Sequence, residues 1–352
     1  MSIKEKTPFE AFLETHDDGA WATAVQELMP SIHEVDRTAT QVWFRFFPLA
    51  LLRAFERSED PARLAQELLM QGRWYLKDQA DSSHTFLYGH RFWPETKRAV
   101  LRAAESELKT GATLADAVRK VARAVASERK IDESLATGIA AVGLMTLQQT
   151  GLAEFKRTPG EVLIDRAHLK RTPEEILRER AKDDGQGLFG FLRTTDKQWT
   201  VVWDENKDER RFRAVDNQEL ASGAANDKRP WHEQDERCTV NEGPIPVQCR
   251  SASCGTCWVG VLGGAEKLTE VDWRERKMMP LFGYIETDEP RPLIRLSCQA
   301  RANGAVSVVI PPWNGYFGKY LKRAGEGSEA NAGEENASEA VASGALTRAK
   351  KD

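Results

Sequence analysis

Three cysteines crowd into the stretch QCRSASCGTCW at residues 248–258, in a chain of 352 residues that holds only five cysteines. Cys249, Cys254 and Cys257 follow the spacing C-x4-C-x2-C, with glycine and serine among the residues between them. A disulfide framework is not expected from five unevenly spaced cysteines in so long a chain. Because clustered thiols bind metals or exchange electrons, the stretch predicts a metal or redox site on a tight loop.

A fourth cysteine, Cys298, lies in RLSCQA after forty intervening residues. Four thiolates can ligate two sulfide-bridged irons, two for each iron, and this spacing is typical of plant-type [2Fe–2S] sites. A loop can wrap such a cluster only if its backbone is permissive and its amides can point at the sulfurs. Gly255 and the loop serines favour that arrangement.

The same residues resemble a known family. The segments FRAVDNQELASGA, PVQCRSASCGTCWVGV and IRLSCQARANGAVSVVIP are similar to the plant-type and bacterial [2Fe–2S] ferredoxin domain, over roughly residues 197–312. The resemblance implies a β-grasp fold, in which a helix packs across a mixed sheet and the cluster loop lies at one edge. It also implies a [2Fe–2S] cofactor with four ligands, which are Cys249, Cys254, Cys257 and Cys298.

Three departures from the family pattern leave all four ligands in place. Ala252 stands where the family usually has glycine, and residues 222–244 look like an insertion before the loop. The stretch between Cys257 and Cys298 is also longer than usual. These departures predict a loop backbone and a cluster cover that differ from those of the family.

Other interpretations of the cysteines stay open at this point. CGTC alone is similar to a thioredoxin-type redox pair, although that motif opens a helix and CWVGVLGG has the pattern of a strand. Structural zinc usually takes two C-x2-C pairs, of which only one is present, and a cluster could also serve structure alone. Cys238, in DERCTV, lies outside the spacing and is expected to be an ordinary, partly buried cysteine.

The first part of the chain has a helical pattern from about residue 8 to 155. Amphipathic helices are predicted over 18–32, 58–76, 94–111 and 113–130, the second of them with Ser58 as its N-cap. DESLATGIAAVGLMTLQQTG, which begins at Asp132, is apolar nearly all round and predicts the buried central helix of a bundle. The predicted fold class is therefore α+β, an all-α N-terminal domain followed by a β-grasp ferredoxin-like domain.

The predicted domains are a helical bundle (1–155), a charged linker with one helix near Thr172 (156–185), the [2Fe–2S] ferredoxin domain (186–322) and a disordered tail (323–352). Within the third, QWTVVWDENKDERRFRAV predicts one hairpin, and RANGAVSVVIPP predicts another that turns at Asn303 and Gly304. The apolar residues of GQGLFGFL (185–192) require burial.

Several classes of function lack support in the sequence. His84 and His90, in HTFLYGHRFWPE, could hold a haem or a metal, but aromatic packing between helices is the simpler interpretation. No nucleotide-binding or Ser-His-Asp motif is present. The net charge of −4 argues against nucleic-acid binding, and the apolar runs are too short to span a membrane. We expect a cytoplasmic protein with no secretory signal.

These features together predict an electron-transfer protein that carries single electrons on the cluster. Residues 186–322 hold 19 Lys and Arg against 19 Asp and Glu, so the domain lacks the strong acidic field by which free plant-type ferredoxins find basic partners. A component docked to a redox partner protein is therefore expected. Two alternatives are an oxidoreductase subunit with an unrecognised site in the helical domain and a cluster-based redox sensor.

Overall fold

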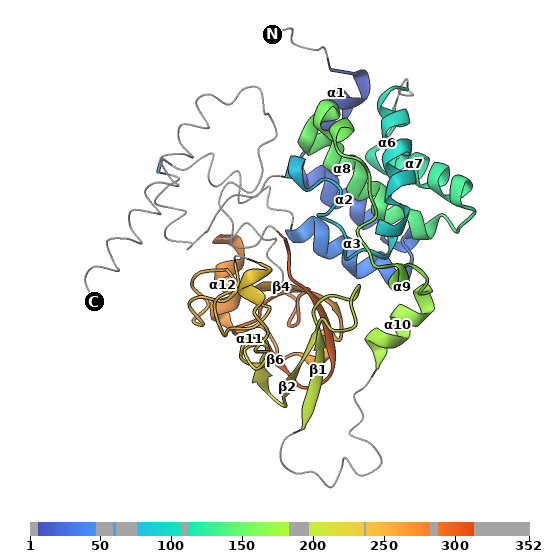
Figure 1. Cartoon of the computed structure of the whole chain (residues 1–352). Helices are drawn as coiled ribbons and strands as arrows, with labels where there is room; N and C mark the ends of the chain where they lie inside the picture. The colour runs from blue at the N-terminus through green and yellow to red at the C-terminus, as the bar shows by residue number, and fades with distance from the viewer. Residues whose placement is uncertain are drawn as a thin grey trace. The chain divides into compact units, whose positions relative to one another are not determined.

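The computed structural model describes residues 6–46, 59–60, 76–106, 111–182, 197–235, 237–281 and 288–312 (Figure 1). These residues divide into two compact units, a helical one that takes in 6–46, 76–106 and 111–179 and a mixed one that takes in 59–60, 180–182, 197–235, 237–281 and 288–312. The predicted α+β fold class is confirmed, because helices dominate the first unit and the second contains a mixed sheet.

Capped amphipathic helices build the helical unit. Thr7 and Thr113 each open a helix with a capping box. In each box the threonine side chain accepts from a backbone amide of the first turn, and the carboxylate of Glu10 or Asp116 accepts from the backbone amide of the threonine. The helices are α1 (Pro8–Glu14), α2 (Asp18–Leu28), α3 (Glu34–Phe46), α6 (Trp93–Ala104), α7 (Leu114–Arg129), α8 (Ser134–Arg157), α9 (Arg166–Leu169) and α10 (Pro173–Ala181). Short 3-10 turns cover Met29–Ser31, Leu76–Asp78 and Tyr88–Phe92.

Helix α8 is the centre of this unit, as predicted. Every residue from Ala136 to Thr150 is buried, and α1, α3, α6 and α7 pack around the helix. A helix that is apolar on all sides can be stable in water only if other helices enclose it. Gly151, with a φ of 76°, breaks the helical geometry before the last turns.

The charged segment after α8 belongs to the helical unit as far as Glu179, beyond the limit of residue 155 expected from the sequence. Hydrogen bonds hold it to the 3-10 turn at Tyr88–Phe92. Tyr88 Oη donates to the Arg171 carbonyl (3.3 Å), and Arg91 Nη1 donates to the Leu169 and Arg171 carbonyls (3.3 and 2.7 Å). Hydrogen bonds from side chains to backbone carbonyls leave no periodic apolar signal in the sequence.

The mixed sheet has the strand order β2-β1-β7-β4-β5 (Figure 1). Its strands are β1 (Gln198–Val202), β2 (Arg211–Val215), β4 (Trp258–Gly263), β5 (Ile294–Leu296) and β7 (Val306–Val309). β1 and β7 are parallel, and every other neighbouring pair is antiparallel. With the short helix α11 (Leu220–Ala224) against β2, this is the predicted β-grasp arrangement.

The two predicted hairpins have different outcomes. The β1–β2 hairpin is confirmed, with Val201 paired to Phe212. The hairpin about Asn303 and Gly304 is wrong, because β6 (Arg301–Ala302) pairs with β3 (Gln218–Glu219) while β7 pairs with β1 and β4. The sequence indicates a turn there, but it does not show which strands pair with the two segments on either side of the turn.

Some predictions lie outside the described residues. These are most of the helix predicted over 58–76, the apolar stretch 185–192 and the tail 323–352. Among the residues that are described, no helix is long and apolar enough to cross a membrane.

Candidate metal centre

The structure brings the four predicted ligands together as two pairs. The side chain of Cys249 hydrogen-bonds with that of Cys254, and the side chain of Cys257 hydrogen-bonds with that of Cys298. Cys254 and Cys257 are each 2% exposed and Cys298 is 5% exposed, whereas Cys249 is only half-buried. One sulfur pair therefore has a member near the surface and the other lies inside.

Strand pairing brings the distant fourth cysteine to the loop. β4 begins directly after Cys257, and Trp258 at its start pairs with Leu296 at the end of β5. The Ser297 amide then donates to the Cys257 carbonyl (3.0 Å), so the next residue, Cys298, lies beside the loop. Because a strand follows CGTC, the helix that a thioredoxin-type pair requires is absent at this position.

The cysteine loop turns through three residues in the left-handed region, Arg250, Ala252 and Gly255, with φ of 53°, 62° and 65°. Successive turns of this kind point backbone amides into a concave site that favours negative charge. The amides of Ser251 and Ser253 donate to Cys249 Sγ at 3.4 and 3.3 Å. The loop thus aims its donors at sulfur.

Ala252 occupies one of these left-handed positions although it is not glycine. It is 2% exposed, and its backbone hydrogen-bonds to Cys298. An alanine at this φ costs about 1–2 kcal/mol relative to a right-handed residue. The loop therefore keeps a left-handed turn here at some cost, and its amide reaches the second sulfur pair.

Two side chains add further polar contacts to the sulfurs. Thr256 Oγ1 lies 3.1 Å from Cys254 Sγ, and Gln299 Nε2 donates to Cys298 Sγ at 3.4 Å. Hydrogen bonds of this kind stabilise negative charge on a thiolate.

Within each pair one thiol is favoured as the thiolate. The hydrogen bond with Cys254 lowers the pKa of Cys249 to about 3, and the same contact raises the pKa of Cys254. Likewise the hydrogen bond with Cys257 lowers the pKa of Cys298 and raises that of Cys257. Since metals bind thiolates, the site already favours the form that a metal would take at one sulfur of each pair.

The four cysteines are the donor set of the candidate metal centre. Among the described residues, no three or more His, Cys, Asp or Glu side chains are grouped so that they could hold a metal ion. A [2Fe–2S] cluster requires two thiolates for each of its two bridged irons, so the four cysteines fit that group.

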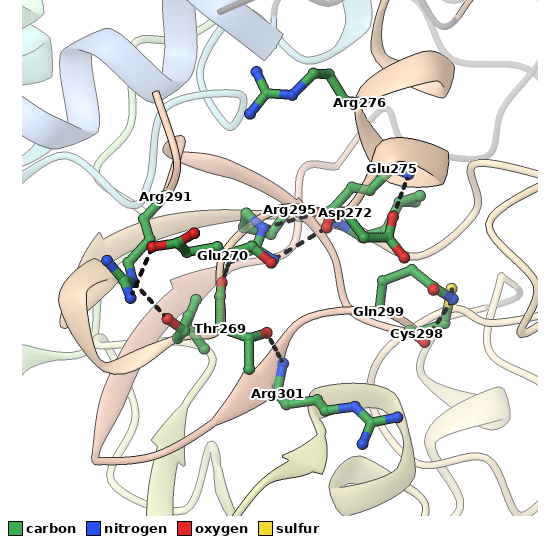
Figure 2. A network of polar contacts seen from close by, with 12 residues as sticks. Thr269, Glu270, Asp272, Glu275, Arg276, Arg291, Arg295, Cys298, Gln299 and Arg301 are labelled. Carbon is green, nitrogen blue, oxygen red and sulfur yellow. Dashed lines mark hydrogen bonds and ion pairs between the residues drawn. The ribbon is translucent and has the colours of Figure 1, made fainter. Parts of the chain in front are cut away.

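A buried ion pair that the sequence analysis missed anchors the strand before Cys298 (Figure 2). Glu275, on α12 (Trp273–Leu281), accepts from Arg295 Nε (2.9 Å) and Nη2 (3.1 Å), and the Leu296 amide also donates to it (2.6 Å). Both side chains are at most 1% exposed, and burial raises the pKa of Glu275 despite the neighbouring guanidinium. Arg295 Nη1 donates onward to the Thr269 carbonyl (2.6 Å).

Cys238 is the fifth cysteine, which the sequence analysis left outside the ligand set. It is buried, its Sγ donates to the Pro244 carbonyl (3.5 Å), and burial raises its pKa to about 12.

His84 and His90 form a closed hydrogen-bond chain in the helical unit. His84 Nε2 donates to the Ala80 carbonyl (3.1 Å), and the Leu163 amide donates to His90 Nε2 (3.0 Å). These contacts assign the remaining proton to His90 Nδ1, which donates to His84 Nδ1 (3.0 Å). All four ring nitrogens are occupied, so this pair offers no lone pair to a haem or a metal.

A scan against protein-family models, a search of curated proteins and a search of solved structures each found no match.

Removing the Glu275 carboxylate should destabilise the mixed unit. Glu275→Ala leaves the Arg295 guanidinium buried without its partner, which costs about 3–5 kcal/mol. The double variant Glu275→Leu/Arg295→Met removes both charges and should recover most of that loss. The free energy of unfolding in urea measures both, and equal losses for the single and double variants would contradict the assignment.

The histidine pair should make the helical unit sensitive to acid. Burial lowers the pKa of His84 to about 3 and that of His90 to about 2, whereas an unfolded histidine titrates near 6.5. Their contribution to stability is complete above about pH 6.5 and is lost as pH falls toward the folded values. Between pH 7 and 5.5 the loss should be about 2–2.5 kcal/mol for the two together.

Urea unfolding followed by circular dichroism at 222 nm, at fixed ionic strength, measures this loss. The variant His84→Gln/His90→Gln should be less stable at pH 7 and should lose most of the pH dependence. A wild-type stability that stays constant between pH 7 and 5.5 would refute the assignment of two neutral imidazoles.

Proposed function

We propose that the mixed unit holds a [2Fe–2S] cluster through Cys249, Cys254, Cys257 and Cys298, and that the protein transfers single electrons. The observation that carries the proposal is the grouping of the four sulfurs into two pairs on a β-grasp scaffold. When bound, such a cluster supplies a one-electron couple.

The chain's own residues would govern that couple. The amides of Ser251 and Ser253 and the side chains of Thr256 and Gln299 donate toward sulfur or lie beside it. Such contacts stabilise the more negative, reduced form and raise the reduction potential, whereas burial in an apolar environment lowers it. Hydrogen bonds to sulfur and burial would therefore act on the reduction potential of this site in opposite directions.

The exposure of the four cysteines also indicates the side of the unit at which electrons would enter and leave. Three of the sulfurs are buried and Cys249 is half-buried, with Ser251 and Ser253 exposed beside it. The loop side of the unit is thus the side on which sulfur comes closest to solvent. Donor and acceptor would be separate redox partner proteins, because the chain shows no flavin or nicotinamide motif.

The cofactor can be tested by composition and by ligand variants. Protein purified without oxygen should be brown and contain two irons and two labile sulfides per chain, as the cluster formula requires. Replacing any one of Cys249, Cys254, Cys257 and Cys298 by serine should lose or destabilise the cluster. Cys238→Ser, the matched control, should keep its iron, sulfide and visible absorbance. A cluster that survives Cys298→Ser but is lost in Cys238→Ser would overturn the ligand assignment.

The reduction potential tests the electron-transfer proposal. Four thiolate ligands without histidine place the couple near about −400 mV, well below the range of Rieske centres. A redox titration followed by electron paramagnetic resonance measures the midpoint. A value above about −100 mV would be inconsistent with all-thiolate ligation, and a cluster that cannot be reduced reversibly would remove electron transfer altogether.

A further inference from the structure

The outer face of α12 carries a tryptophan in solvent. Trp273 is 69% exposed, more than Val240 (58%), Leu163 (50%) or Val215 (37%), the other large apolar side chains described as exposed. A single exposed apolar residue is common, but tryptophan is the side chain most enriched in the energetic centres of protein interfaces.

The charges on α12 are divided between its two faces. Glu275, the only acidic residue of the helix, is buried against Arg295, so the exposed charged residues are basic. Arg274 and Lys277 are exposed, and neither forms an ion pair with another described residue. The Arg274 guanidinium lies 5.4 Å from the centroid of the Trp273 ring, and Lys277 follows Trp273 by one helical turn.

The neighbouring acidic side chains have polar contacts of their own. Asp272 caps the helix by accepting from the Glu275 amide (2.8 Å), and Glu270 pairs with Arg291 (3.4 Å). On α12 itself, Arg274 and Lys277 thus place two cations beside one exposed aromatic ring.

This face is coupled to the candidate metal centre. The Leu296 amide donates to Glu275, and Cys298 follows Leu296 by two residues, a separation of at most about 7 Å along the chain. Figure 2 shows Glu275 and Arg295 together with Cys298 and Gln299. A protein bound to α12 would thus contact the helix that is hydrogen-bonded to the strand leading to a cluster ligand.

We propose that Trp273, Arg274 and Lys277 form a docking surface for an acidic protein that exchanges electrons with this chain. The electron exchange rests on the proposed function, whereas the docking does not. Complementary charge accelerates association and selects orientation, and an aromatic ring with an adjacent guanidinium supplies desolvated contact area. Because residues 186–322 hold equal numbers of basic and acidic residues, this attraction would act at short range and not through a long-range field.

The test uses full-length protein and cytochrome b5, an acidic haem protein, as the probe. Arg274→Glu/Lys277→Glu is compared with Lys197→Glu/Lys207→Glu, which makes the same change in net charge at and near the β1–β2 hairpin. At low ionic strength the α12 variant should bind cytochrome b5 at least about tenfold more weakly than the control variant, with a smaller salt dependence. Trp273→Ala should weaken binding about fivefold or more without changing the salt dependence.

Two readouts separate this proposal from the proposed function. Calorimetric affinity and carbodiimide cross-linking of Lys277 to probe carboxylates, mapped by mass spectrometry, need no electron transfer. Stopped-flow oxidation of the dithionite-reduced protein then reports exchange. A chain without a cluster that still binds through α12 would refute the proposed function alone. Equal binding by the two charge variants, or no binding by the wild type at low salt, would overturn the docking surface.

Discussion

The register between β4 and β5 is the constraint on which the candidate centre depends. Pairing of Trp258 with Leu296 sets Cys257 beside Cys298, although forty residues separate them in the chain. A slip of one residue would turn every side chain of β5 to the other face of the sheet. The buried contact of Glu275 with both Arg295 and the Leu296 amide fixes this register with charge as well as with backbone hydrogen bonds.

Buried carboxylates play a comparable part in the helical unit. Asp36 accepts from the Tyr88 and Gly89 amides (2.6 and 2.7 Å), and Asp81 accepts from Trp93 Nε1 and the Gly160 amide (both 2.7 Å). Asp36, on α3, thereby holds the 3-10 turn at Tyr88–Phe92, and Asp81 links the first residue of α6 to Gly160. In both units, then, single buried acidic side chains join segments that are distant in the sequence.

The sequence predicted the features that have a period or a fixed spacing. The apolar run of α8, the β1–β2 hairpin and the cysteine spacing are local patterns, and each led to the observed element or loop. The ion pair of Glu275 with Arg295 could not be predicted, because it joins a helix and a strand twenty residues apart. The chain through His84 and His90 depends on the Leu163 amide, which no side-chain pattern reveals. The pairing of the strands on either side of Gly304 is predicted wrongly, because the partner of each strand depends on the whole sheet.

The antiparallel pairing of β4 with β5 also has a consequence for the long stretch between Cys257 and Cys298. The chain leaves the sheet after Gly263 and returns at Ile294, and the paired strands bring those two points close together. The parts of this connection that do not contact β5 can lengthen or shorten without moving either cysteine, because closing a longer loop costs little free energy. Among the described residues of the connection, only the segment that carries Thr269 and Glu275 is tied to β5, so the register of two short strands and this one anchor preserve the candidate centre.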